Sequence, residues 1–109
     1  MAKNLNVSVL IDFYGQLLTQ KQLDSLRLYY NEDLSLAEIA DEMGISRQGV
    51  RDNIKRAEAQ LFDLEAKLGL AERFQKISDD IKVVEDMLTS DKIDLNEIRN
   101  RLKQIQKEV

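Results

Sequence analysis

A short stretch near the middle of the chain concentrates basic side chains. Residues 47–56 carry four Lys or Arg side chains and one carboxylate, a local charge of +3, whereas the full 109 residues carry −4. Basic and amide side chains on one exposed helix face can contact phosphates and base edges in the major groove of a duplex. The stretch therefore predicts a nucleic-acid contact. Its candidate residues are Ser46, Arg47, Gln48, Arg51, Asp52, Lys55 and Arg56.

Asp52 is the candidate that fits this interpretation least well. A carboxylate on a reading face repels phosphates unless it accepts from a cytosine amine or pairs with a basic neighbour, here Arg51, Lys55 or Arg56. The sequence leaves these options open. It also leaves open that the face is an ordinary solvated helix surface, held by pairs of side chains four residues apart.

Two short helical patterns must position these side chains, and together they predict a helix-turn-helix over residues 35–57. Ser35 followed by Glu38 is a capping box, so a helix should begin at the next residue. Gly44 should end it, because the turn after a short helix commonly needs a positive φ that glycine adopts without strain. Ser46 then caps the second helix. The expected inward residues are Leu36, Ile39, Ala40, Met43, Val50, Ile54 and Ala57, with Ile45 at the corner.

Two further helices precede the motif and complete a helix-turn-helix domain over residues 1–61. The first is expected from Val7 to Leu18, and Gly15 within it predicts close packing. A second capping box, Thr19 with Gln22, opens the next helix. The expected inward residues are Val7, Leu10, Ile11, Tyr14, Leu17 and Leu18 in the first helix and Leu23, Leu26 and Tyr30 in the second, followed by a loop over residues 31–34.

The apolar pattern continues beyond this domain, into an amphipathic extension over residues 62–109. The helix after Ser46 keeps its inward spacing through Leu61, Leu64 and Leu68 as far as Gly69, which predicts a long recognition helix. Two more apolar repeats follow. We expect the extension to pack as one unit with residues 1–61.

The two repeats after residue 69 predict a C-terminal helical hairpin. Ser90, Asp91 and a cap formed by Asp94 with Glu97 favour a turn between them. The surplus of apolar side chains predicts a homodimer, with fold-back on the first two helices as the alternative. The expected interface residues are Phe74, Ile77 and Ile81, or Leu102 and Ile105. The full seam is Phe74, Ile77, Ile81, Val84, Leu88, Leu95, Ile98, Leu102, Ile105 and Val109.

Composition narrows the function classes. The chain has no proline, and its apolar periodicity near 3.5 predicts an all-α protein. It also has no cysteine and no histidine, and its glycines form no phosphate-binding loop, so we expect no enzyme activity, no metal and no cofactor. The N-terminal segment has an acid at Asp12 and too short an apolar stretch for a signal sequence, and no apolar run is long enough to span a bilayer. These features predict no membrane contact and a cytoplasmic location.

The motif also carries a family resemblance. Residues 17–61 resemble region 4 of bacterial sigma-70-type factors, the part that reads the promoter −35 element. The similarity includes the Leu18-Thr19 opening, the Leu26-Arg27-Leu28-Tyr29-Tyr30 helix, Glu38-Ile39-Ala40, Gly44-Ile45-Ser46 and the Val50-Arg51 pair. The whole chain is similar to the small bacterial YlxM-like family, most specifically in TQKQ, SLAEIADEMGISRQGV and DNIKRAE. The resemblance implies a nucleic-acid-binding fold and a role in the signal-recognition-particle pathway, with the particle's RNA or GTPase as partner.

Two functional hypotheses follow. In the first, the protein is a regulator that binds DNA through residues 46–56. In the second, it is an accessory of the signal recognition particle, and its helix-turn-helix contacts RNA or protein instead of DNA. Function depends on the site and not on the scaffold, so the resemblance alone does not choose between them.

Overall fold

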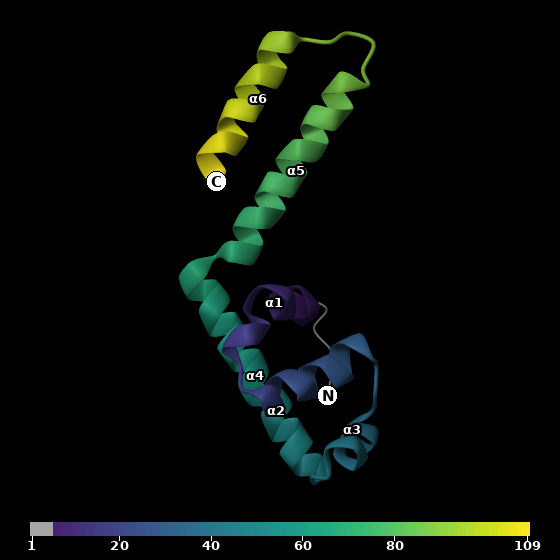
Figure 1. The fold of residues 1–109 in the computed structure, drawn as a ribbon. Coiled ribbons are helices and arrows are strands. Elements are labelled where there is room, and N and C mark those ends of the chain that lie inside the picture. Colours follow the sequence, from purple (N-terminus) through teal and green to yellow (C-terminus); the bar gives the residue numbers. More distant parts are fainter. Residues whose placement is uncertain (1–5) are drawn as a thin grey trace. The chain divides into compact units, whose positions relative to one another are not determined.

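The computed structural model describes residues 6–109, and every regular element in that range is helical (Figure 1). A single 3-10 turn, η1 (Gly15–Leu17), follows the first helix, and a π-helical turn, η2 (Arg27–Asn31), follows the second. The all-α prediction is confirmed, including the helix-turn-helix, the long recognition helix and the C-terminal hairpin. The helices are α1 (Asn6–Tyr14), α2 (Gln20–Leu26), α3 (Leu36–Met43), α4 (Arg47–Leu68), α5 (Leu70–Leu88) and α6 (Leu95–Glu108).

The chain divides into two compact units at Gly69. We call the described residues up to Gly69 the N-terminal unit and residues 70–109 the C-terminal unit. The domain boundary expected after Leu61 falls inside α4, which continues until the left-handed Gly69 ends it. The buried stripe of α4 ends at Leu61, because Leu64 is half-buried and Leu68, predicted to point inward, is 48% exposed. Packing of the extension as one unit with residues 1–61 stays a prediction. The prediction that the N-terminus is no signal sequence depends partly on residues 1–5, which lie outside the described residues.

Helix α4 is the centre of the N-terminal unit, where it packs against α1, α2 and α3. Its inward residues Val50, Ile54, Ala57 and Leu61 are completely buried, as their spacing predicted. Burying a side chain the size of Val, Ile or Leu stabilises a fold by about 1.5–3 kcal/mol. The orientation of α4 about its own axis is therefore strongly specified, and so is the set of residues on its outer face.

Two tyrosines of the first helices reinforce this orientation by hydrogen bonds to α4. The hydroxyl of buried Tyr14 donates to Glu65 Oε1 at 2.6 Å. The hydroxyl of Tyr30 donates to Glu58 Oε1. Hydrogen bonds to a charged acceptor are stronger than neutral ones, and both glutamates sit on the flank of α4 that faces the earlier helices. They fix the rotation of the helix that carries the candidate site.

The first two helices differ from their predicted form in two places. Helix α1 ends at Tyr14, and the following turn leaves Leu17 58% exposed, so its inward placement was wrong. A Cβ on Gly15 would lie 3.0 Å from Leu23 Cδ1, which confirms the predicted close packing and explains why the chain tightens there.

The second difference concerns the tyrosines of η2. Tyr29 is buried, whereas Tyr30, predicted to point inward, is half-buried. A tyrosine hydroxyl needs a hydrogen-bond partner when it leaves water, and that of Tyr30 reaches Glu58 at the edge of the core. The loop predicted over residues 31–34 begins one residue late, because the π-helical turn includes Asn31.

The C-terminal unit is the predicted hairpin of α5 and α6. Asp94 begins α6 by accepting from the backbone N–H groups of Asn96 at 3.0 Å and Glu97 at 3.2 Å. Within the seam, Val84 and Ile98 are buried and Ile77 and Ile105 are half-buried. The exposed seam positions are Phe74, Ile81, Leu88, Leu95, Leu102 and Val109.

Two ion pairs connect α5 to α6 along one side of the hairpin. Lys76 Nζ lies 2.7 Å from Glu108 Oε1, and Arg101 lies 3.7 Å from Asp80 Oδ1. The hydrogen bond to Glu108, together with its negative charge, raises the pKa of Lys76. Both pairs lie on the same side of the hairpin and match the antiparallel register of the two helices.

Candidate nucleic-acid interface

The turn between α3 and α4 is built by local hydrogen bonds that the sequence specifies. Ser35 Oγ accepts from the N–H of Glu38, and the Glu38 carboxylate accepts from the N–H of Ser35, both at 3.1 Å. Gly44 follows in the left-handed conformation, with a φ of 68°. Ser46 Oγ then accepts from the N–H of Gly49 at 3.0 Å and begins α4. The predicted caps and turn are confirmed.

All seven candidate residues lie on the first three turns of α4 or on its cap. Val50, Ile54 and Ala57 are fully buried and form the inner side of α4, so the opposite side of the helix faces solvent. Ser46 serves as the cap and is itself exposed. We call the exposed side chains after it the contact face: Arg47, Gln48, Arg51, Lys55 and Arg56, all of which are exposed, whereas Asp52 is half-buried.

Asp52 has a partner that the sequence analysis did not consider. The amide Nε2 of Gln48 donates to Asp52 Oδ1 at 3.0 Å, one helical turn away. The sequence left Arg51, Lys55 or Arg56 open as partners, whereas the structure gives the Asp52 carboxylate a hydrogen bond from Gln48. Amide-to-carboxylate pairs at this spacing are a common helix-surface interaction. The four basic side chains of the contact face thus keep their charge available, while Gln48 is engaged within its own helix.

A hollow next to the contact face adds residues that the sequence analysis missed as site residues. It has a volume of about 310 Å³ between the starts of α3 and α4. Leu36 and Ala37 line its α3 side, and Arg47, Gln48 and Arg51 line its α4 side. The spacing of Leu36 placed it in the core, so the sequence did not mark it as a site residue. The signal available was the Ser35 cap, because a helix start leaves backbone N–H groups without partners inside the helix. Two guanidinium groups beside such a hollow suit a phosphate.

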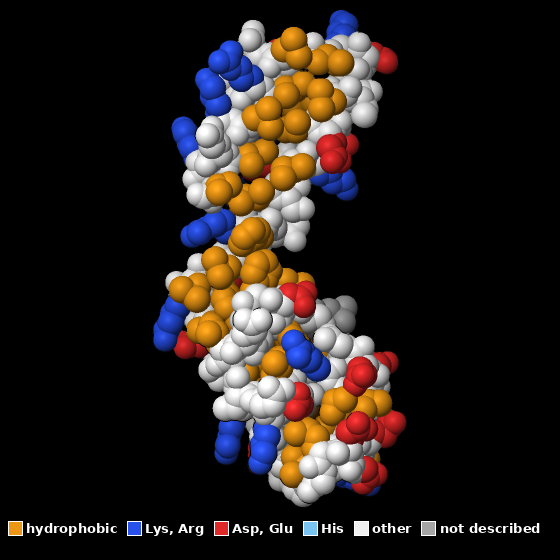
Figure 2. Space-filling model, viewed as in Figure 1, with side chains coloured by type: hydrophobic (Ala, Val, Ile, Leu, Met, Phe, Trp, Pro, Cys, Tyr) orange, Lys and Arg blue, Asp and Glu red, His pale blue; other side chains and the backbone are white. Residues whose placement is uncertain are grey.

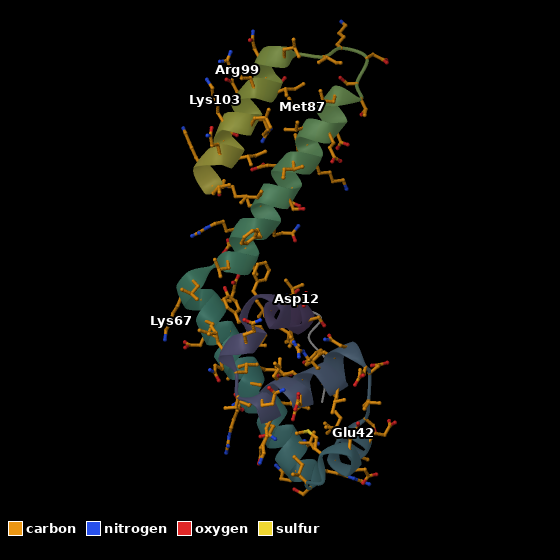
Figure 3. The ribbon with its side chains drawn as sticks, in the orientation of Figure 1. Asp12, Glu42, Lys67, Met87, Arg99 and Lys103 are labelled. Carbon is orange, nitrogen blue, oxygen red and sulfur yellow. The ribbon has the colours of Figure 1, made fainter. Side chains whose placement is uncertain are left out.

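Apart from Asp52 on α4, the acidic side chains of the motif lie on α3 and its basic side chains lie on α4. The exposed acids Glu38, Asp41 and Glu42 belong to α3. In Figure 2 acidic side chains gather around α3, while basic side chains project from α4 on the other side. A polyanion is therefore attracted to α4 and repelled by the outer side of α3. Figure 3 places Glu42 on α3, away from the outer side of α4.

A second groove, of about 650 Å³, lies between the end of α2, η2 and α3. Lys21 and Arg27 line it together with Asp24, Glu32 and Glu42, so its charges nearly balance. Across residues 6–109 the acidic side chains form no group of three or more that could hold a metal ion. Nor does that range contain a helix with the length and hydropathy needed to cross a bilayer.

Two capped helices joined by a left-handed glycine, with a long second helix whose outer face is basic, define a helix-turn-helix protein. Comparison with known proteins gives the family. Residues 1–107 match the UPF0122 family model, described as "Putative helix-turn-helix protein, YlxM / p13 like". The chain belongs to this family, which confirms the resemblance to the YlxM-like family.

Individual relatives agree with the family match. The chain is 48% identical over 92 residues to a UPF0122 protein of Acetivibrio thermocellus, an alignment that covers 84% of this chain and 79% of the relative. It is 53% identical over 76 residues to UPF0122 proteins of Bacillus cereus strain AH187 and Bacillus anthracis, which covers 70% of this chain and 69% of each relative. The family description names a helix-turn-helix and no enzymatic activity.

Proposed function

We propose that this protein binds nucleic acid through the contact face of α4. The observation that carries the proposal is the placement of Arg47, Arg51, Lys55 and Arg56 on the exposed side of a second motif helix whose opposite side is fully buried. In helix-turn-helix proteins this helix is the one that enters the major groove. The cluster is a local exception in a chain of net charge −4, so binding depends on this face.

The contacts on this face are mostly to the phosphate backbone. Arg47 and Arg51 border the hollow at the starts of α3 and α4, where a phosphate would meet both guanidinium groups and exposed backbone N–H groups. Gln48, the side chain best suited to read a base edge, is hydrogen-bonded to Asp52. Base-specific readout would have to break that bond. Three or four phosphate contacts give weak binding with a shallow dependence on salt.

We propose further that the physiological contact is with the signal recognition particle, through its RNA or its GTPase. The support is the family resemblance together with the chemistry of the face: structured RNA is recognised largely through backbone and shape, which a carboxylate such as Asp52 disturbs less than it disturbs major-groove readout. A DNA-binding regulator is the alternative. A cytoplasmic location is part of the same proposal.

A competition experiment tests this choice. The protein is offered particle RNA, the GTPase, their complex and random-sequence duplex DNA at physiological salt. We expect preference for particle components. Equal or better binding of the random duplex would overturn the particle assignment and leave general DNA binding.

Protein contact through the groove beside η2 is a second candidate. The groove has two basic and three acidic side chains around half-buried Leu28, and this mixture suits a protein surface better than a polyanion. Arg27→Glu would then reduce binding of the GTPase and leave binding of RNA unchanged.

We also propose that the protein forms a homodimer through its C-terminal unit.

A further inference from the structure

The α5–α6 hairpin has two unlike faces. One carries the ion pairs of Lys76 with Glu108 and of Asp80 with Arg101. The other carries apolar side chains that remain in solvent: Ile81 is 46% exposed, Leu88 52%, Leu95 73% and Leu102 50%. Figure 2 shows hydrophobic side chains running along both helices on the visible face of this unit.

The helical positions explain why these four side chains share a face. Each residue turns by about 100° around the axis. On α5, Ile81 and Leu88 lie to one side of the buried residue Val84. On α6, Leu95 and Leu102 lie to the same side of the hairpin relative to the buried residue Ile98. Asp80 and Arg101 turn to the opposite side, where they meet. We call Ile81, Leu88, Leu95 and Leu102 the open face.

The hairpin alone buries only a few of the apolar side chains whose helical spacing predicts burial. Val84 and Ile98 are its buried hydrophobic residues among positions 70–109. Two helices cannot enclose a core, whereas four helices in a bundle can. Four half-exposed aliphatic side chains leave on the order of 400 Å² of apolar surface, which is at the size that marks an interaction site.

We propose that a second copy of this chain covers the open face, so that two hairpins form a four-helix bundle with α5 of each copy lying over α6 of the other. The inference deepens the homodimer proposed above and is independent of nucleic-acid binding. A face two helices wide and fourteen residues long measures about 20 Å by 20 Å. With its polar rim, its burial in both copies approaches the roughly 1,200 Å² at the lower end of stable interfaces.

Charge at the edges of the open face selects this arrangement. Glu85 follows Val84 and Arg99 follows Ile98, so each lies about 100° from the buried seam, at the outer edge of its helix on the open side. Figure 3 shows Arg99 and Lys103 pointing outward from α6, away from α5. The α5 edge therefore offers a carboxylate where the α6 edge offers basic groups.

The two possible pairings place these edges differently. When α5 lies over the partner's α6, Glu85 of each copy meets Arg99 of the other, because the Asp80–Arg101 pair between the antiparallel helices sets Val84 and Ile98 at nearly the same height. When α5 lies over the partner's α5, the basic edges of the two α6 helices, with Arg99 and Lys103, face each other instead. Like charges across an interface are unfavourable, so the first pairing is selected. Its twofold axis is parallel to the helices.

The test uses the full chain without nucleic acid. Sedimentation equilibrium from about 1 to 200 µM should show the mass rising from 12.6 kDa toward twice that value. Leu102→Glu should raise the dissociation constant at least tenfold. Asn100→Glu, which adds the same charge on the opposite side of α6, should leave it unchanged. A single-chain mass throughout, or a dimer indifferent to Leu102→Glu, overturns the proposal.

Cross-linking tests which helices of the two copies pair. The chain has no cysteine, so each variant contains only the introduced thiol. Single variants Glu85→Cys and Arg99→Cys are mixed and oxidised. The proposed pairing predicts the mixed disulfide between the two variants, identified by its mass, in several-fold excess over either self-linked species. Efficient linking within Glu85→Cys alone, or within Arg99→Cys alone, would contradict it. Because residues 47–56 are untouched, these results are separate from any failure of nucleic-acid binding.

Discussion

Gln48 Nε2 donates to Asp52 Oδ1 at 3.0 Å, so the amide best placed to read a base is bound to the carboxylate that most opposes phosphate. This hydrogen bond determines which side chains of the contact face are available to bind nucleic acid. Four basic side chains remain available beside it, but the group that would provide sequence selectivity is occupied. We therefore expect binding in which backbone contacts dominate and sequence preference is weak.

Replacing Asp52 by Asn should strengthen binding. Asn keeps an oxygen that can accept from Gln48 but removes the negative charge, which should increase affinity about fivefold, or about 1 kcal/mol, at low salt. Fluorescence anisotropy with labelled RNA and duplex DNA measures the change. Asp63→Asn removes an exposed carboxylate further along α4 and should have little effect. Weaker binding by Asp52→Asn would show that the carboxylate itself makes a contact.

Tyr30→Phe should destabilise the N-terminal unit. It keeps the ring packed edge-on against Tyr29 but removes the hydrogen bond to Glu58. The loss should be about 1–2 kcal/mol, seen as a lower urea midpoint in circular dichroism. Tyr14→Phe, which loses the bond to Glu65, should behave similarly. Unchanged urea midpoints in both variants would show that these hydrogen bonds do not stabilise the packing of α4.

Gly44→Ala should destabilise the same unit through backbone strain alone. Gly44 has a φ of 68°, and a Cβ there would meet no atom within 4 Å. The expected cost is about 1 kcal/mol. Gly44→Asn should cost less, since Asn tolerates the left-handed region. Equal stability of the wild-type and Ala proteins would indicate that the turn relaxes to another conformation.

Local signals account for what the sequence predicts well. Ser35, Gly44 and Ser46 act within three or four residues of themselves, so their caps and turn could be located without knowing the rest of the fold. The buried stripe of Val50, Ile54 and Ala57 then determined which side of α4 is exposed. The contact face followed from these two facts.

Features that depend on alternatives of similar energy were not predictable. Asp52 had several partners within reach, and periodicity could not rank Gln48 above the basic residues. The π-helical turn at Arg27–Asn31 depends on how Tyr29 and Tyr30 share the core and Glu58, which no local pattern specifies. Periodicity also identified the seam at Ile81 and Leu102 but could not say what covers it.

The most direct test of the central claim is reversal of two charges on the contact face. Arg51→Glu with Lys55→Glu should abolish binding to RNA and to duplex DNA in anisotropy titrations at low salt, with helicity unchanged by circular dichroism, because both side chains are exposed. Lys67→Glu with Lys92→Glu makes the same change in net charge elsewhere and should retain binding. Unchanged affinity in the first variant, or equal loss in both, would contradict nucleic-acid binding through α4.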